Sequence, residues 1–355
     1  MASPLAARLL DHVRKHGPLP FIDAMRLALY DPVDGYYTSP NLPIGRSADF
    51  VTAPEHHPAF GLLVGRRIAA IHSELGSPSD FTVIEMGAGT GALARGVLRA
   101  CDAAALPVRY RIVEPLAIWR ERQVDTLRPW RDRVDWVEDL EASPPLTGVF
   151  LSNELLDAFP VRRLLLRRDG SLAEVAVDST GERLVEVRTP VSEADAAVIR
   201  TRIPVLPPVG VEFAFIPDLP AWLAAVRRVV RRGAVLTIDY GATEDRLFSR
   251  APGRAAVRAY YRQHAVPDLL ESPGRHDLTA DVNFSDLLRL AEGLGMAAHA
   301  FTSQRQFLMA MGWRTLLHAP DTVDRRALTD LVDPDAMGAT LVLELGLPEE
   351  TGGRL

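Results

Sequence analysis

The stretch Val83–Leu93, VIEMGAGTGAL, contains the pattern that decides the fold. Its apolar start, together with Phe81 and Thr82, predicts a buried strand over 81–87. Glycines follow at 87, 89 and 91, and the period that continues through Val97 and Cys101 predicts a helix over 90–101. A strand that passes through a glycine-rich turn into a helix leaves backbone N–H groups and open space at the strand's carboxyl end. The turn therefore predicts a ligand site there.

The same alternation of strand and helix continues beyond the turn and returns near the end of the chain. Alternating units of this kind predict an α/β fold with a parallel sheet and helices on both faces. The further predicted strands are 108–114, 134–139, 148–154, 234–241, 297–302 and 338–347, and the further predicted helices are 115–128, 219–232, 285–294 and 304–317.

Two regions interrupt this rhythm. Helices are expected over 3–16, 20–29 and 60–75, with a Pro- and Gly-rich loop over 31–61 between them. After Pro160, the segments VRRLLLRR, SLAEVAVD and RLVEVRT predict an antiparallel meander with a turn at Asp169-Gly170, followed by a helix near 193–201. The arginines of VRRLLLRR are expected on the solvated face of this meander.

These patterns predict the domain organisation. Residues 1–75 are expected to form N-terminal helices and a loop that covers the cofactor or substrate, and residues 161–229 a β-meander and helical insertion. The Rossmann-like core is expected over 76–160 and 230–355, with a loop-rich excursion over 242–284.

Composition narrows the class of protein. Of 355 residues, 47% are hydrophobic and 24% charged, which is typical of a soluble enzyme. The net charge of −6 argues against a nucleic-acid partner, and no apolar run approaches ~18 residues, so no membrane span is expected. With no secretory signal and a single cysteine, Cys101, we expect a cytoplasmic protein without an intrachain disulfide. The adjacent His56 and His57 are not expected to bind a metal ion.

The glycine turn is compatible with two different ligands. Gly87, Gly89 and Ala92 fit the dinucleotide pattern, and Glu114 follows about 20 residues later, so a nicotinamide cofactor is one reading. Glu85 favours the other reading, because a carboxylate beside a pyrophosphate is destabilising, whereas beside an ammonium or sulfonium it is stabilising. S-adenosylmethionine carries both cations and no phosphate. A purely structural turn is the third alternative.

If the ligand is S-adenosylmethionine, the strand ends suggest how each part is bound. The glycine backbone would approach the methionine portion, Glu114 would accept from the ribose hydroxyls, and Asp139 would accept from the adenine amino group, with Leu140 beside the ring. Phe50 and Thr52 are expected to cover the cofactor from the 31–61 loop, and Asn153 to lie near it. The complete set of expected cofactor residues is Phe50, Thr52, Glu85, Gly87, Gly89, Gly91, Glu114, Asp139, Leu140 and Asn153.

Several further motifs occur in order along most of the chain. They are LALYDPVDGYY (27–37), ADFVTAPE (48–55), EMGAGTG (85–91), YRIVEP with RERQ (110–123), SNELLDAFPV (152–161), LTIDYG (236–241) and SPGRHDLTADVNF (272–284). Together with the glycine turn, they resemble the family of class I methyltransferases that contains bacterial MidA and the mitochondrial complex I assembly factor.

The resemblance implies a seven-stranded, mostly parallel methyltransferase core with family-specific insertions. It also implies an arginine side chain of a protein partner as the methyl acceptor. The sequence departs from the family pattern at Ala48, over Ala255–Arg258 and at Asn283, which stand in place of a glycine, a Gly-Thr-Leu-Arg-like run and an aspartate. These departures concern the acceptor more than the cofactor.

Methyl transfer to a guanidinium requires alignment of the acceptor and removal of a proton. SNELLDAFP supplies two candidate catalytic carboxylates: Glu154, expected to face the acceptor, and Asp157, which is equally well explained as a helix cap. His264 is a candidate proton acceptor. Expected substrate residues are Glu55, Asp239, Tyr260 and Tyr261, although each is compatible with a packing role.

Two other functions stay open on the sequence alone. One is N- or O-methylation of a small metabolite, and the other is a non-catalytic assembly factor that binds the cofactor. A homodimer is also left open.

Overall fold

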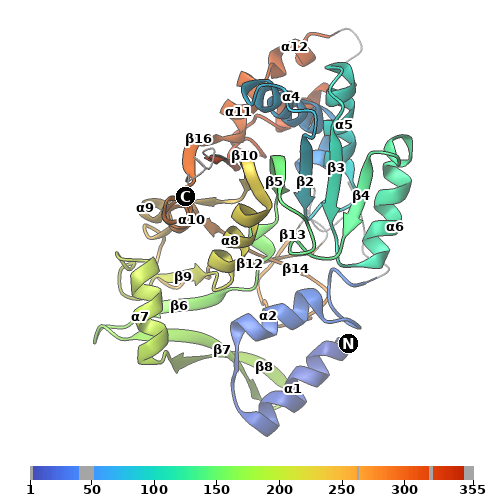
Figure 1. Ribbon diagram of the computed structural model, residues 1–355. Coiled ribbons are helices and arrows are strands. Elements are labelled where there is room, and N and C mark those ends of the chain that lie inside the picture. The colour runs from blue at the N-terminus through green and yellow to red at the C-terminus, as the bar shows by residue number, and fades with distance from the viewer. Residues whose placement is uncertain (1–2, 40–51, 262–263, 320–322, 348–355) are drawn as a thin grey trace. The chain divides into compact units, whose positions relative to one another are not determined.

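The structure is a computed structural model that describes residues 3–39, 52–261, 264–319 and 323–347 (Figure 1). The chain divides into two units, each built from three segments. The first unit comprises Met1–Phe50, Leu156–Leu219 and Tyr240–Arg289, and the second comprises Val51–Leu155, Pro220–Asp239 and Leu290–Leu355. The segments that interrupt the predicted alternation of strands and helices therefore belong mainly to the first unit.

The second unit contains a seven-stranded sheet, whose order is characteristic of its fold. Neighbouring strands are parallel except for β17, which runs antiparallel to β10 and β16. The chain enters at β2, fills one side through β3 and β4, and then crosses to β5, so the switch in strand order lies between β2 and β5. In spatial order the strands are β16 (Ala297–Ser303), β17 (Leu341–Leu347), β10 (Val230–Asp239), β5 (Leu146–Asn153), β2 (Thr82–Met86), β3 (Arg109–Val113) and β4 (Val134–Val137).

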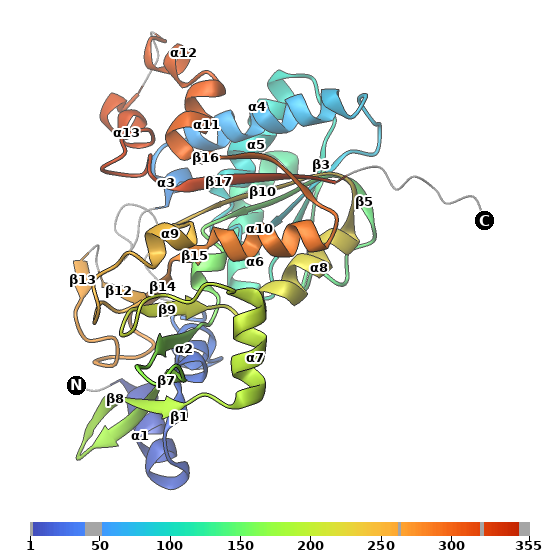
Figure 2. The same ribbon diagram turned by 90° about the vertical axis from the view of Figure 1, so that its left-hand side faces the viewer.

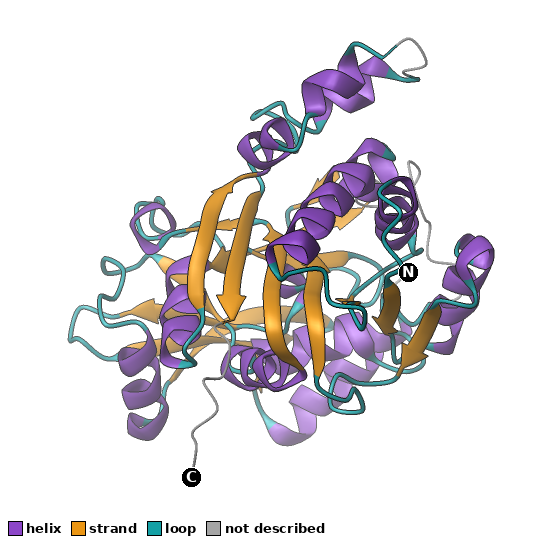
Figure 3. Cartoon of the chain, turned by 45° about the horizontal axis from the view of Figure 1, so that its top comes forward, coloured by secondary structure: helices purple, strands orange, loops and turns teal. Residues whose placement is uncertain are grey.

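Helices cover both faces of this sheet, as Figures 2 and 3 show. On one face lie α4 and α5, which approach so closely that a Cβ on Gly61 would lie 2.8 Å from the Cα of Gly96. On the other face, Trp222 of α8 packs against Phe150 of β5 with 5.7 Å between ring centroids. The helices are α3 (Ala53–His56), α4 (Ala59–Glu74), α5 (Ala92–Ala103), α6 (Ala117–Thr126), η2 (Arg128–Trp130), α8 (Leu219–Val229), α11 (Gln304–Ala310), α12 (Trp313–Leu317) and α13 (Arg325–Asp330).

The first unit is built around an antiparallel sheet. α7 buries Ile199 against Leu164 and Phe213 of that sheet. The sheet contains β1 (Leu19–Pro20), β6 (Arg162–Leu166), β7 (Leu172–Thr180), β8 (Arg183–Pro190) and β9 (Glu212–Phe215). The helices of the first unit are α1 (Pro4–His16), α2 (Phe21–Tyr30), η3 (Leu156–Ala158), α7 (Glu193–Arg202), α9 (Glu244–Leu247) and α10 (Phe284–Gly293), the last belonging to it through Arg289.

The expected loop-rich excursion over 242–284 has more regular structure than its turn formers suggest. It contains a three-stranded antiparallel sheet of β12 (Val257–Tyr261), β13 (His264–Val266) and β14 (Asp277–Ala280). It also contains β15 (Val282–Asn283), which pairs with β11 (Gly241–Ala242). Strands this short give almost no periodic signal, and only their pairing partners stabilise them.

The expectation that the arginines of VRRLLLRR are solvated is wrong for Arg163. Its side chain is 1% exposed. Its guanidinium lies 4.6 Å from the ring centroid of Phe21 and forms ion pairs with Glu212 and Glu186. Alternation along a strand predicts which residues share a face, but not that α2 covers that face.

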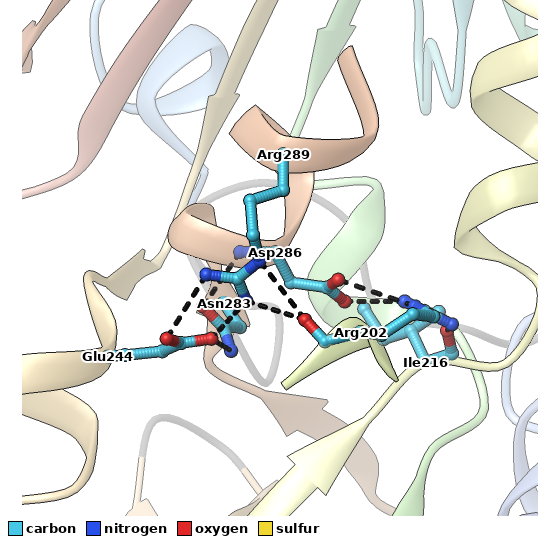
Figure 4. Close-up of polar contacts among 6 residues, drawn as sticks. All are labelled: Arg202, Ile216, Glu244, Asn283, Asp286 and Arg289. Atoms are coloured by element: carbon cyan, nitrogen blue, oxygen red, sulfur yellow. Dashed lines mark hydrogen bonds and ion pairs between the residues drawn. The ribbon is translucent and has the colours of Figure 1, made fainter. Parts of the chain in front are cut away.

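A second, partly buried network joins α7, α9 and α10 of the first unit (Figure 4). Arg202 donates to the Asp286 carboxylate and, at 2.9 Å, to the carbonyl of Ile216. Arg289 pairs with Glu244 and donates to the carbonyl of Arg202. Cations and carboxylates alternate through this network, so its charges neutralise one another.

Asn283 has a specific place in the same network. Its Nδ2 donates to Glu244 at 3.1 Å, and its Oδ1 accepts from the amide of Asp286 at 3.1 Å. An aspartate at 283 could make the second bond but not the first, and its charge would face that of Glu244. The departure from the family pattern at this position therefore matches its local partner.

Candidate functional site

The carboxyl ends of the parallel strands in the second unit bring most of the expected cofactor residues together. β2 and β5 lie side by side at the switch in strand order, with β3 next to β2 and β4 next to β3. In open α/β sheets, ligands bind at the carboxyl edge beside such a switch. The site is described below from β2 outward.

The glycine turn follows β2 directly. Gly87, Gly89 and Gly91 all adopt positive φ, at 79°, 52° and 82°. The turn is closed by the amide of Gly91, which donates to the carbonyl of Ala88 at 2.8 Å, and Gly91 then caps α5 in the left-handed conformation. A Cβ on Gly89 would meet no atom within 4 Å, so the backbone there borders open space. A side chain at this point would occupy that space.

Glu85, on β2, is buried deeper than the sequence suggests. Its carboxylate accepts from the Tyr110 hydroxyl at 2.6 Å. Burial raises the pKa of Glu85 to about 7, and the bond from Tyr110 opposes the rise. The carboxylate is thus close to its midpoint at neutral pH, and a nearby cation would favour its ionised form.

Glu114 lies at the end of β3 and is also buried. Its carboxylate accepts from the amide of Leu116 at 3.1 Å and from Nε2 of Gln123 at 3.0 Å. Burial raises the pKa of Glu114, while these two hydrogen bonds act in the opposite direction. Gln123 ends the RERQ motif but was not among the expected site residues, because the sequence does not show that its side chain is buried against Glu114.

Asp139 and Leu140, which come after β4, differ in burial. Asp139 is exposed, and its Oδ1 accepts from the amide of Ala142 at 2.6 Å. Leu140 is buried. Asp139 therefore shapes the turn that contains it.

The end of β5 carries an unusual backbone. Glu154 is not a glycine, yet its φ is +51°. Its amide donates to the carbonyl of Ile238 at 2.8 Å, and one of its carboxylate oxygens accepts from Nδ2 of Asn153 at 3.2 Å. Left-handed backbone at such a residue costs on the order of 1–2 kcal/mol and is concentrated at functional sites.

Asp239 supports this turn from the neighbouring strand. It is fully buried at the end of β10, and its Oδ2 accepts from the amide of Leu155 at 3.1 Å. The contact assigns it to the backbone of the turn after Glu154. Its expected role in contacting substrate stays a prediction.

Glu55 lies beside the glycine turn, since its carboxylate accepts from the Thr90 hydroxyl. Thr52 is the N-cap residue of α3 and is partly buried. Phe50 falls outside the described residues, so the expected cover over the cofactor can be followed only from Thr52 onward.

The remaining candidates belong to the first unit. Asp157 is buried in η3. Tyr260 and Tyr261 lie on β12, and His264 begins β13 directly opposite Tyr261. The Tyr261 ring lies 5.5 Å from that of His276. An acceptor role for these four residues stays a prediction.

Comparison with known proteins decides the family. A family model described as "Putative S-adenosyl-L-methionine-dependent methyltransferase" matches residues 63–302. The chain belongs to this family. It is an S-adenosyl-L-methionine-dependent methyltransferase, and the expected cofactor and class of enzyme are confirmed. The nicotinamide reading of the glycine turn is thereby excluded.

Curated relatives of this methyltransferase span most of its length. "Protein arginine methyltransferase NDUFAF7 homolog, mitochondrial" of Drosophila melanogaster is 30% identical over 82% of this chain and 70% of the relative. "Protein arginine methyltransferase NDUFAF7, mitochondrial" of Rattus norvegicus is 28% identical over 87% and 74%. These names do not favour the small-metabolite or non-catalytic alternatives.

A solved structure of the same kind confirms the fold. A "likely methyl transferase" from Burkholderia thailandensis bound to S-adenosyl-homocysteine is 30% identical, has a TM-score of 0.87, and is matched over 96% of this chain and 91% of that one. The expected α/β class I methyltransferase fold is therefore confirmed.

The residues at the carboxyl edge fit this cofactor. Gly89 borders open space, and buried carboxylates lie on β2, at Glu85, and directly after β3, at Glu114. Asn153 is 8% exposed, and its Oδ1 has no hydrogen-bond partner among the described residues. A buried acceptor of this kind requires a donor, and an ammonium group is one.

The comparisons correct one expectation. The cytoplasmic location expected from the sequence is contradicted, because the fly and rat relatives are named as mitochondrial proteins. In the part of the chain that the structure describes, no helix has the length and apolar character required to span a membrane.

Proposed function

We propose that this methyltransferase transfers a methyl group to the guanidinium of an arginine side chain in a protein partner. The observation that carries the proposal is the similarity to relatives named as protein arginine methyltransferases, which extends over more than 80% of the chain. A homodimer stays a prediction, because nothing above bears on it.

We propose specific roles for the residues that would hold the cofactor. The glycine turn faces the methionine portion, and Oδ1 of Asn153 accepts from its ammonium group. Glu114 accepts from the ribose hydroxyls, and Asp139 and Leu140 hold the adenine. Thr52, with Phe50, covers the cofactor. The support is the position of most of these residues at one sheet edge, together with Oδ1 of Asn153, which has no partner within the described part of the chain.

The chemical step requires help from the protein at the acceptor. A guanidinium is a poor nucleophile because its charge is delocalised and its pKa exceeds ~12. S-adenosyl-L-methionine supplies a methyl group whose bond to sulfur breaks with the electron pair remaining on sulfur. The Glu154 carboxylate pairs with the guanidinium, orients one nitrogen toward that methyl group, and takes up the proton that this nitrogen loses as the N–C bond forms.

The geometry of the turn supports this role for Glu154. Its strained φ and the hydrogen bond from its backbone amide to the carbonyl of Ile238 fix the direction in which the side chain leaves the backbone. Asn153 donates to the carboxylate and so holds its orientation. A carboxylate held in this way loses less entropy when it pairs with an arginine.

The experiment is incubation of the enzyme with radiolabelled S-adenosyl-L-methionine and lysate from cells grown with a methylation inhibitor. Labelled protein is hydrolysed and its amino acids are separated. Labelled methylarginine is the expected product, and it should be lost with Glu154→Gln. Label confined to small molecules, or to a residue other than arginine, would contradict the acceptor assignment.

A further inference from the structure

Gln123 is the one buried residue of α6, a helix whose other residues, apolar and polar alike, are partly or fully exposed. Its side chain is 0% exposed. Glutamine is seldom fully buried, and a buried amide is costly unless its donors and acceptor are satisfied. Its contacts therefore show what the burial achieves.

Three hydrogen bonds satisfy the amide. Nε2 donates to the carbonyl of Gly89 at 2.8 Å and to Oε2 of Glu114 at 3.0 Å. Oε1 accepts from the indole Nε1 of Trp136 at 2.8 Å. An indole N–H can only donate, and a carbonyl and a carboxylate can only accept, so the orientation of the amide is fixed by its partners.

These partners belong to three neighbouring parts of the sheet edge. Gly89 is in the turn after β2, Glu114 ends β3, and Trp136 is on β4. The amide thus fixes the distance between the glycine turn and the carboxylate. Under the proposed function, those two groups bind the methionine and ribose portions of the same molecule.

The charge on Glu114 depends on the same contact. Burial raises the pKa of Glu114, and the bond from Gln123 counteracts the rise. A carboxylate that is to accept from both ribose hydroxyls, one at each oxygen, must be ionised, because a protonated carboxyl uses one oxygen as a donor. Removal of the amide donor would therefore favour the protonated form and also free the carboxylate to rotate.

We propose that Gln123 is a positioning residue for the cofactor, which joins the glycine turn to Glu114 and orients that carboxylate toward the ribose. This inference rests on the proposed role of Glu114. It predicts that exchanges at 123 weaken cofactor binding specifically through the ribose.

The test measures binding of S-adenosylhomocysteine by calorimetry to wild type, Gln123→Met and Gln123→Glu. Methionine keeps the length of the side chain but loses all three bonds, and glutamate keeps an acceptor for Trp136 but loses both donors. Affinity should fall about 10- to 100-fold in each variant, as is typical when a hydrogen bond to a charged group is removed. If one variant does not fold, the other carries the test.

Gln304→Met is the matched control. Gln304 is equally buried in the second unit, and its Nε2 donates to the carbonyl of Leu331 at 2.9 Å. The exchange removes a buried hydrogen bond directly after β16, which is separated from β2 in the sheet by β17, β10 and β5. It should lower thermal stability but change the affinity for S-adenosylhomocysteine less than 3-fold or so.

Two readouts separate positioning from general destabilisation. In wild type, the 3′-deoxyribose analogue of S-adenosylhomocysteine should bind more weakly than the parent, and in Gln123→Met this difference should shrink to near zero. The pH below which affinity falls should also be higher in Gln123→Met, because the pKa of Glu114 rises.

The outcomes distinguish the two claims. If Glu114→Gln leaves binding unchanged, the proposed role of Glu114 fails, and the inference about Gln123 fails with it. If Glu114→Gln weakens binding but Gln123→Met behaves like Gln304→Met, only the inference about Gln123 is overturned.

Discussion

Two buried carboxylates of the first unit have different partners from two buried carboxylates at the sheet edge of the second unit. In the first unit, Arg163 neutralises Glu212, and Arg202 neutralises Asp286. At the carboxyl edge of the second unit, Glu85 is held by a tyrosine hydroxyl, and Glu114 by an amide and a backbone N–H. Arg120 also attracts Glu114, but less than either hydrogen bond does.

The difference distinguishes carboxylates that stabilise the fold from carboxylates that can bind a charged ligand. The negative charge of a carboxylate that is paired with arginine is already neutralised within the protein. One held by neutral donors keeps its negative potential for a ligand, at a cost in stability. The second arrangement suits a cofactor that carries a sulfonium and an ammonium, and the following variants test the comparison from the largest expected effect to the smallest.

Arg163→Met should have the largest effect, because it removes the close cation of the buried Glu212 and leaves it with the exposed Arg188, whose Nη2 lies 3.7 Å away. Removal of one partner of a buried ion pair typically costs about 3–5 kcal/mol. Urea denaturation would measure the loss. Arg14→Met, at an exposed pair with Glu182, is the control and should cost less than about 1 kcal/mol. Equal losses in the two variants would show that the ion pairs of Arg163 contribute no more to the free energy of unfolding than an exposed pair does.

Glu85→Gln should change how stability depends on pH. The pKa of Glu85 is raised by burial to about 7 in the folded state, from 4.5 when unfolded, so its contribution is fully present below pH 4.5 and is lost as pH rises through 7. At pH 8 the variant should be more stable than wild type by on the order of 2–3 kcal/mol, with little difference near pH 4.5. Thermal unfolding at several pH values would measure this, and parallel curves would contradict it.

Asn283→Asp should weaken the network in Figure 4. It replaces a donor to Glu244 with a like charge, so the free energy of unfolding should fall by about 1–2 kcal/mol. Asn283→Asp combined with Glu244→Gln should recover part of the loss, which chemical denaturation can measure. Additive losses in the double variant would rule out the pairing.

Glu154→Gly should have the smallest effect on stability and a large effect on activity. Glycine adopts φ +51° without strain, so the variant should gain up to about 1 kcal/mol in unfolding free energy. Methyl transfer should nevertheless fall at least about 100-fold. A stable variant with wild-type turnover would remove Glu154 from the chemistry.

The sequence predicted the fold more fully than it predicted the site. The strand around Val83 and the helix after Gly91 were correct because long apolar periods reflect burial directly. β9 and α13 were missed, since each is too short to show a period. The burial of Arg163 could not be predicted, because it depends on a distant helix that supplies Phe21.

At the site, glycine and acid positions could be predicted from their place at the strand ends. Their partners could not, because contacts of Glu85 with Tyr110 and of Glu114 with Gln123 join separate elements. Asp239 was expected as a substrate residue on the predicted strand 234–241, but its hydrogen bond to Leu155 is visible only in the structure. A buried glutamine in a largely exposed helix is the kind of signal that only homologous sequences or coordinates reveal.

The hydrogen bond from the Leu155 amide to Asp239 has a consequence for how such enzymes diversify. The chain departs from the second unit immediately after each of these residues, so two of its exits are tied together at a single point. The segments inserted after Leu155 and after Asp239 can therefore be exchanged while the second unit keeps its geometry. An engineer who wants a new acceptor on an old scaffold would cut at these two joints.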